Sequence, residues 1–270
     1  MISPIITELS NLDKFFFYFF LPALVVFVVG GQRFYFRSKK PTAAIFRLSE
    51  ELIFGNIVAA FVGSLIAIFL YLYILELDRL EHLKWEFLTL VGFVFLSIPI
   101  GIGIGTHVVA VSVRKLLDTQ AKNAQEMARA IQYFHYPFSH NLMFSSALLL
   151  GYLLALLDFF RGRNLELNNL QIGLLVLSGV TIGAGAGILF IITKCHRLIL
   201  RTTLILSASV FVLSLGESRT LIYHPIAFLF TVWCVTITLG ILLYKQTRVN
   251  LRGPVKRMVK KWLQWDIDYL

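Results

Sequence analysis

Histidines are the residues of this sequence best suited to chemistry, because a neutral imidazole binds metal ions and haem iron and titrates near neutral pH. Among the six histidines of the 270-residue chain, we identify His107, His135 and His140 as candidate metal ligands. His135 and His140 lie on either side of Pro137, in the sequence His-Tyr-Pro-Phe-Ser-His. A metal ion and a haem are therefore the two cofactors that these side chains suggest.

The spacing of the three histidines matches no established metal-binding motif. Residues on one face of an α-helix are three or four positions apart, whereas His135 and His140 are five apart. No Cys or Glu completes a pattern such as His-Glu-x-x-His. His107 and His140 can meet only if their helices are neighbours, and His135 can approach them only if the chain before Pro137 folds back. The alternatives are packing histidines that hydrogen-bond to carbonyls or to Ser and Asn side chains, and a protonation switch or substrate contact.

The remaining histidines carry weaker expectations. His196 follows an apolar segment on the same predicted side of the chain as the three candidates. His82, in an acidic loop, and His224, beside Pro225, fall on the opposite side and are predicted to be solvated.

The elements that must position these histidines are apolar segments long enough to cross a membrane. The sequence is 57% hydrophobic and 15% charged, whereas soluble domains carry about 25% charged residues. A helix of about 20 apolar residues spans a hydrocarbon core of about 30 Å. Seven segments meet this requirement, roughly 15–31, 52–74, 87–112, 138–160, 172–193, 198–216 and 225–244. The sixth contains Arg201 in its first turn, and without it the count is six.

The basic residues predict an orientation for these segments. The chain has 25 Lys and Arg against 15 Asp and Glu, a net charge of +10, and Lys and Arg are enriched in cytoplasmic loops. In this sequence 19 of them follow the first, third, fifth or seventh segment. The other six are Lys14, Arg79, Lys84, Arg161, Arg163 and Arg219. The alternation predicts an amino terminus outside the cytoplasm and a carboxyl terminus inside it, and it attributes the positive charge to membrane orientation rather than to nucleic-acid binding.

Three local patterns bear on how the segments pack. Glycines alternate with other small or apolar residues in 101–105 and in 183–187, which favours close helix packing, with a tandem duplication of helical hairpins as the alternative. Apolar residues recur at helical spacing through 113–134, which predicts a cytoplasmic extension of the third helix or a helix lying on the inner leaflet. Pro137 is predicted to occupy the first turn of the fourth helix.

Residues 250–270 are predicted to form a basic amphipathic cytoplasmic tail, separate from the membrane domain of residues 1–249. Apolar side chains recur there at helical spacing opposite a basic face, which is typical of a helix lying in the membrane interface. We expect it to bind anionic lipid of the cytoplasmic leaflet; docking on a partner protein is the alternative. The lipid-contacting residues would be Lys256, Arg257, Lys260, Lys261 and Trp262.

The predicted fold class is an all-α, multi-pass transmembrane helix bundle in the plasma or inner membrane. The segments carry no Asp, Glu, Lys or Arg near their middle, so the carboxylates of many proton-coupled carriers are missing. The leading functional hypothesis is a small-solute transporter or channel, on the basis of the all-membrane architecture and the glycine-rich faces. The alternatives are a histidine-ligated metal- or haem-binding membrane enzyme or redox protein, and an accessory or assembly subunit. A homo-oligomer or a larger membrane complex would be the corresponding partner.

Overall fold

The structure is a computed structural model that describes residues 10–37, 58–77, 83–116, 124–161, 165–216 and 220–248. All regular elements within these ranges are helices. In chain order they are α1 (Asn11–Phe15), the π-helix η1 (Phe16–Phe20), α2 (Leu21–Arg37), α4 (Ala59–Leu77), α5 (Leu83–Leu116), α6 (Ala124–Tyr133), the π-helix η4 (Phe134–His140), α7 (Asn141–Arg161), α8 (Asn169–Ile192), α9 (His196–Gly216), the 3-10 helix η5 (Leu221–Tyr223) and α10 (Pro225–Arg248).

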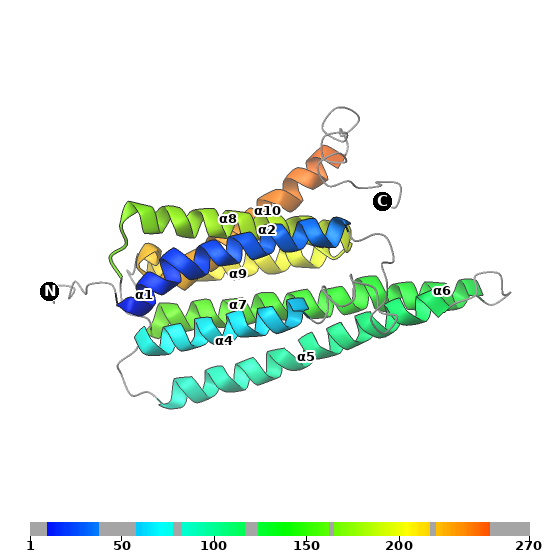
Figure 1. The fold of residues 1–270 in the computed structure, drawn as a ribbon, viewed down its shortest axis with the longest axis horizontal. Coiled ribbons are helices and arrows are strands. Elements are labelled where there is room, and N and C mark those ends of the chain that lie inside the picture. The colour runs from blue at the N-terminus through cyan, green and yellow to red at the C-terminus, as the bar shows by residue number, and fades with distance from the viewer. Residues whose placement is uncertain are drawn as a thin grey trace.

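The helices run alternately in opposite directions along one axis (Figure 1). Six stretches are long and apolar enough to cross a membrane, and α4 contributes a shorter apolar stretch, Phe61–Ile74, among the described residues. The structure thus confirms the predicted all-α membrane bundle. Helices α5 and α8 end, and helices α6 and α9 begin, at the same end of the bundle. We call it the basic end, because the Lys and Arg residues predicted to face the cytoplasm follow the apolar segments there.

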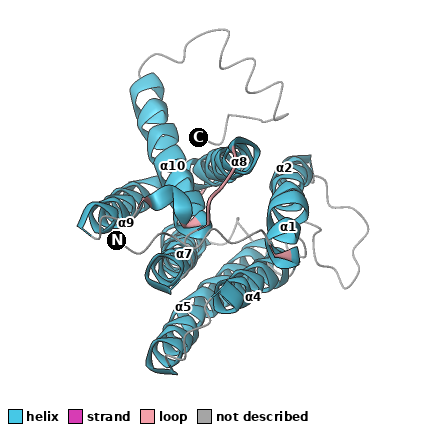
Figure 2. Cartoon of the chain, turned by 90° about the vertical axis from the view of Figure 1, so that its left-hand side faces the viewer, coloured by secondary structure: helices cyan, strands magenta, loops and turns pink. Residues whose placement is uncertain are grey.

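Helix α7 lies in the middle of the bundle. Viewed along the bundle, it has α9 and α10 on one side and α4 and α5 on the other (Figure 2). Buried apolar side chains of α7, α8, α9 and α10 form one cluster, which includes Phe159, Phe190 and Phe230. A second cluster joins η1 and α4 to α7, α8 and α10, with the rings of Phe16 and Tyr73 stacked at 4.5 Å. Both clusters hold α7 in place, and α7 continues the helix that carries two of the candidate ligands.

The fourth membrane helix differs from its prediction. It does not begin at Phe138: α6, η4 and α7 form one continuous apolar helix from Gln125 to Phe160. Pro137 therefore lies inside this helix rather than in its first turn. Residues 124–134, expected to extend the third helix or to lie on the leaflet, extend the fourth helix instead. A proline interrupts the α-helical hydrogen-bond ladder, and the wider π-helical turn around Pro137 lets the helix continue through it.

Each glycine run makes one close helix contact, and the two contacts are at positions that are not equivalent. A Cβ on Gly183 would lie 2.7 Å from the Trp233 carbonyl oxygen, so α8 touches α10 there. The matching position in the other run is Gly101, around which no described residue would lie within 4 Å of a Cβ. In that run the close approach is at Gly103. Close packing therefore accounts for Gly103 and Gly183, whereas a Cβ on Gly101 or Gly105 would have no described residue within 4 Å.

The prediction that His224 is solvated was wrong. Its side chain is fully buried, with Nδ1 3.2 Å from the backbone oxygen of Asp158 and its ring 5.0 Å from that of Phe159. Asp158 is also fully buried, and its Oδ2 accepts hydrogen bonds from the backbone N–H groups of Ile226 and Ala227 at 2.9 and 3.0 Å. The carboxylate of α7 thus caps the first turn of α10, where a helix leaves N–H groups without partners.

Candidate metal centre

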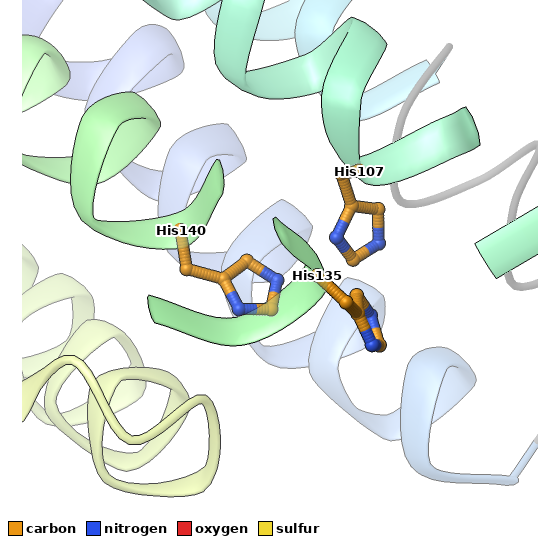
Figure 3. A group of neighbouring side chains, drawn as sticks. All are labelled: His107, His135 and His140. Atoms are coloured by element: carbon orange, nitrogen blue, oxygen red, sulfur yellow. The ribbon is translucent and has the colours of Figure 1, made fainter. Parts of the chain in front are cut away.

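The structure brings the three predicted ligands together at the basic end of the bundle. His107 comes from α5, and His135 and His140 come from η4 (Figure 3). One ring nitrogen of each histidine lies within 4.8 Å of the corresponding nitrogens of the other two. The ring centroid of His107 is 4.5 Å from that of His135 and 4.7 Å from that of His140. We call these three residues the histidine triad.

The π-helix explains how two histidines five residues apart serve one site. In an α-helix with 3.6 residues per turn, side chains five apart differ by about 140° around the axis. In a π-helix the hydrogen bonds join residues five apart, so His135 and His140 lie on successive turns. From the sequence, His135 was expected to reach the other two histidines only if the chain before Pro137 folded back. In the structure the chain does not fold back. A wider turn around Pro137 achieves the same approach within a continuous helix.

A glycine lets α5 come close enough to supply the third histidine. Gly103 is one helical turn before His107, so both lie on the same face of α5. A Cβ on Gly103 would be 2.9 Å from the Ser139 carbonyl oxygen and 3.0 Å from the backbone nitrogen of Met143. No larger residue fits this contact without moving a helix. Gly103 thus fixes the distance between His107 and the two histidines of η4.

The triad is partly enclosed, and each ring has limited contacts. His140 is 5% exposed, whereas His107 and His135 are half-buried. The rings of His107 and His140 have backbone hydrogen-bond partners at His135 and Thr193, respectively. Their Nδ1 atoms are buried and have no hydrogen-bond partner among the described residues. A histidine that binds a metal through one nitrogen commonly directs the other to a backbone carbonyl, and this arrangement matches that pattern.

Aromatic side chains surround the triad. The ring of His140 stacks on Phe144 at 5.5 Å and 14°, and Phe144 meets Phe190 of α8 at 5.0 Å. The ring of Tyr136 lies 4.1 Å from that of His135. Within the described part of the chain, the cluster of potential ligands contains neither a carboxylate nor a thiol. The donor set is therefore three imidazoles in an apolar setting.

The separation of the nitrogens is close to what a metal ion requires. An ion equidistant from three nitrogens 4.8 Å apart would lie about 2.8 Å from each, against a Zn–N bond of about 2.0–2.1 Å. Because 4.8 Å is the largest of the separations, each ring has to move by roughly 0.7 Å at most. Small side-chain rotations cover such a distance.

No family model, no curated protein and no solved structure matches this chain.

The other candidate residues lie elsewhere. His196 begins α9 at the same end of the bundle, but its ring faces Tyr244 at 5.9 Å and is not part of the triad. His82 lies outside the described residues, as do the predicted lipid-contacting residues Lys256, Arg257, Lys260, Lys261 and Trp262.

Sequence reasoning missed the residues that support the triad. Thr193 and Gly103 contribute through backbone atoms and through a missing side chain, which no motif reports. The hydroxyl of Ser139 donates to the backbone oxygen of His135, so it supports the π-helical turn rather than a ring. The one available signal was a proline placed between two histidines in an otherwise helical pattern.

Proposed function

We propose that this chain is an integral membrane protein that binds one divalent transition-metal ion through His107, His135 and His140. The observation that carries the proposal is the convergence of three imidazole nitrogens, from two different membrane helices, to within 4.8 Å of one another. Imidazole is a preferred ligand of Zn²⁺, Cu²⁺, Ni²⁺ and Fe²⁺.

The contacts of the rings favour a ligand role over packing. A buried polar atom without a hydrogen-bond partner destabilises a fold, and packing histidines satisfy their nitrogens through carbonyls or hydroxyls. Within the described residues, the Nδ1 atoms of His107 and His140 lack such partners. The backbone of His135 partners the His107 ring, and the backbone of Thr193 partners the His140 ring. These two contacts would hold the rings in the orientation that a metal requires.

The geometry favours a bare ion over a haem. Two histidines can bind haem iron from opposite faces of the porphyrin. The porphyrin ring then occupies the plane between the two histidines. A third imidazole within 4.8 Å of both nitrogens would occupy that plane. Three converging imidazoles therefore suit a single ion with a compact coordination sphere.

Three histidine ligands leave room for chemistry at the ion. Catalytic zinc sites keep three protein ligands and an open fourth position for water or substrate, and such an ion polarises a bound oxygen or activates water. His107 lies six residues before Val113, where its apolar helix ends, so the site is about 9 Å inside the membrane edge at 1.5 Å per residue. Solutes and lipid headgroups at the basic end are within reach of this depth.

Metal retention by single-histidine variants tests the proposal. Full-length protein purified in mild detergent without chelator is expected to hold stoichiometric metal by elemental mass spectrometry. His107→Ala, His135→Ala and His140→Ala should each weaken binding by more than about 100-fold, since loss of even an indirect partner of a ligand costs about 10–100-fold.

His196→Ala is the matched control, because it removes a histidine at the same end of the bundle that lies outside the triad. His82→Ala is a second control, because His82 is predicted to lie on the opposite side of the membrane. Both should retain wild-type metal content. Wild-type protein without metal, or triad variants that keep it, would contradict the proposal.

The transporter and accessory-subunit hypotheses remain predictions from sequence. The same preparation distinguishes them. Metal flux into proteoliposomes that is lost in His140→Ala would place the ion on a transport path. Large partners that co-purify in mild detergent would indicate an accessory subunit.

A further inference from the structure

A basic cavity lies beside the histidine triad, where α8 turns into α9. Its volume is about 310 Å³, at the lower end of the range for small-ligand pockets. The residues that line it are Asn141, Lys194, Cys195, Arg197, Leu198 and Arg201. Three of the six carry a full positive charge, and none carries a negative one.

The turn between α8 and α9 places Lys194 at this cavity at a conformational cost. Lys194 has a φ of 61°, in the left-handed region that favours glycine. Its N–H donates to the Ile191 oxygen at 3.2 Å, and that of Cys195 donates to the Phe190 oxygen at 3.1 Å. These bonds form a Schellman motif, in which glycine usually occupies the left-handed position. The left-handed conformation at this position directs the lysine side chain, rather than a glycine, toward the lining of the cavity.

The positive charges are concentrated and have no counter-charge among the described residues. Arg197 and Arg201 are four residues apart on one face of α9, where like charges repel. No ion pair of Lys194, Arg197 or Arg201 is found within the described part of the chain, where all three side chains are exposed. Burial raises the pKa of the Cys195 thiol to about 11, so this side chain adds no negative charge at neutral pH. An anion in the cavity would relieve the repulsion.

The cavity is adjacent to the triad through two residues. Asn141 directly follows His140, and Thr193, whose backbone is a hydrogen-bond partner of the His140 ring, directly precedes Lys194. The cavity also lies at the end of the bundle that is predicted to face the cytoplasm, where basic pockets between membrane helices bind lipid headgroups.

We propose that this cavity binds a phosphate group, held by Lys194, Arg197 and Arg201. Arginine suits this role because its planar guanidinium donates two parallel hydrogen bonds to phosphate oxygens. A phosphate-bearing molecule would then be the substrate class presented to the metal ion, and this last step rests on the proposed metal site. The phosphate can come from an anionic lipid headgroup or from a soluble molecule.

Binding to full-length protein in neutral detergent tests the cavity. Native mass spectrometry measures short-chain phosphatidic acid against phosphatidylcholine, and equilibrium dialysis measures radiolabelled inorganic phosphate. Lys194→Gly and the double variant Arg197→Gln/Arg201→Gln are expected to weaken binding at least tenfold. Lys194→Gly suits the backbone conformation, so its thermal stability should equal or exceed that of wild type. The control Arg129→Gln/Lys245→Gln removes two exposed charges elsewhere at the same end and should bind like wild type.

Each result has a defined meaning. Cavity-dependent binding of phosphatidic acid alone supports a lipid source, and cavity-dependent binding of inorganic phosphate supports a soluble one. No binding of either, or equal losses in cavity and control variants, overturns the proposal. Binding is repeated with His107→Ala, where it should persist, and metal content is measured in the cavity variants, where it should be unchanged. Failure of the cavity and failure of the metal site are thereby distinguished.

Discussion

His140 is the residue on which most contacts of the site converge. It contacts His107 and His135 within the triad, stacks on Phe144, and has a backbone partner at Thr193 of the α8–α9 turn. Its side chain thus joins the histidine triad to α8 through Thr193 and through the Phe144–Phe190 contact.

Asp158 is the residue whose loss should affect the fold rather than the site. Asp158→Ala leaves the N–H groups of Ile226 and Ala227 without their buried acceptor, which costs about 1–3 kcal/mol per unsatisfied group. We expect a clear fall in the thermal unfolding temperature with metal content per folded chain unchanged.

Asp158→Asn retains one carbonyl oxygen as an acceptor and should lose less stability than Asp158→Ala. Glu166→Ala removes an exposed carboxylate at the same end and should leave the unfolding temperature unchanged. An unfolding temperature of Asp158→Ala equal to wild type would contradict a capping role.

The π-helix η4 and the contact of α5 with it are the elements that build the site. η4 sets the angle between His135 and His140, and the approach of α5 sets the position of His107. Neither Pro137 nor Gly103 carries a donor atom, but Pro137 lies within the π-helical turn and Gly103 lies at the close contact between α5 and η4.

Gly103→Ala tests the contact between α5 and η4. Its Cβ would meet the Ser139 oxygen at 2.9 Å and Met143 at 3.0 Å, so the helices must separate and His107 must move away from the triad. Overpacking of this kind costs about 1–3 kcal/mol, and we expect metal affinity to fall at least tenfold in a competition titration with a zinc chelator.

Gly105→Ala is the matched control, because no described residue would lie within 4 Å of its Cβ. It should bind metal as tightly as wild type. An equal loss in both variants would indicate a general effect on α5, and no loss in Gly103→Ala would show that the close contact does not position His107.

The apolar helices were predictable from the sequence, whereas the π-helical turn within the fourth helix and the contacts between helices were not. The apolar segments follow from length and hydropathy alone, and α9 forms despite Arg201, whose side chain is exposed at the basic end. The π-turn was not predicted, because a proline within an apolar pattern is equally typical of a helix start. The burial of His224 and Asp158 was also not predicted, because it depends on how α7 and α10 pack, which no local pattern reports.

At the scale of the whole molecule, the alternating directions of the helices and the distribution of basic residues agree. The first helix begins at the end opposite to where α10 finishes (Figure 1), which agrees with the seven predicted segments. The histidine triad and the basic cavity both lie at the end that the distribution of Lys and Arg predicts to face the cytoplasm. The tail of residues 250–270, predicted to bind anionic lipid at that face, lies outside the described residues.

Reporter fusions test this orientation. A reporter that is active only outside the cytoplasm should work when fused after Gly162 and fail when fused after Asn123 or Leu270. The reason is the excess of Lys and Arg at the basic end. Activity after Leu270 would mean that one segment does not cross or that the orientation is reversed.

The most direct test of the account is the ligand shell of the bound metal, measured by X-ray absorption at the zinc edge of the purified, zinc-loaded protein. The account predicts a first shell of nitrogen and oxygen at about 2.0–2.1 Å, with the outer-shell scattering of three imidazoles, reduced to that of two in His140→Ala. A shell dominated by sulfur at about 2.3 Å, or a wild-type spectrum without imidazole scattering, would contradict a histidine triad that holds the ion.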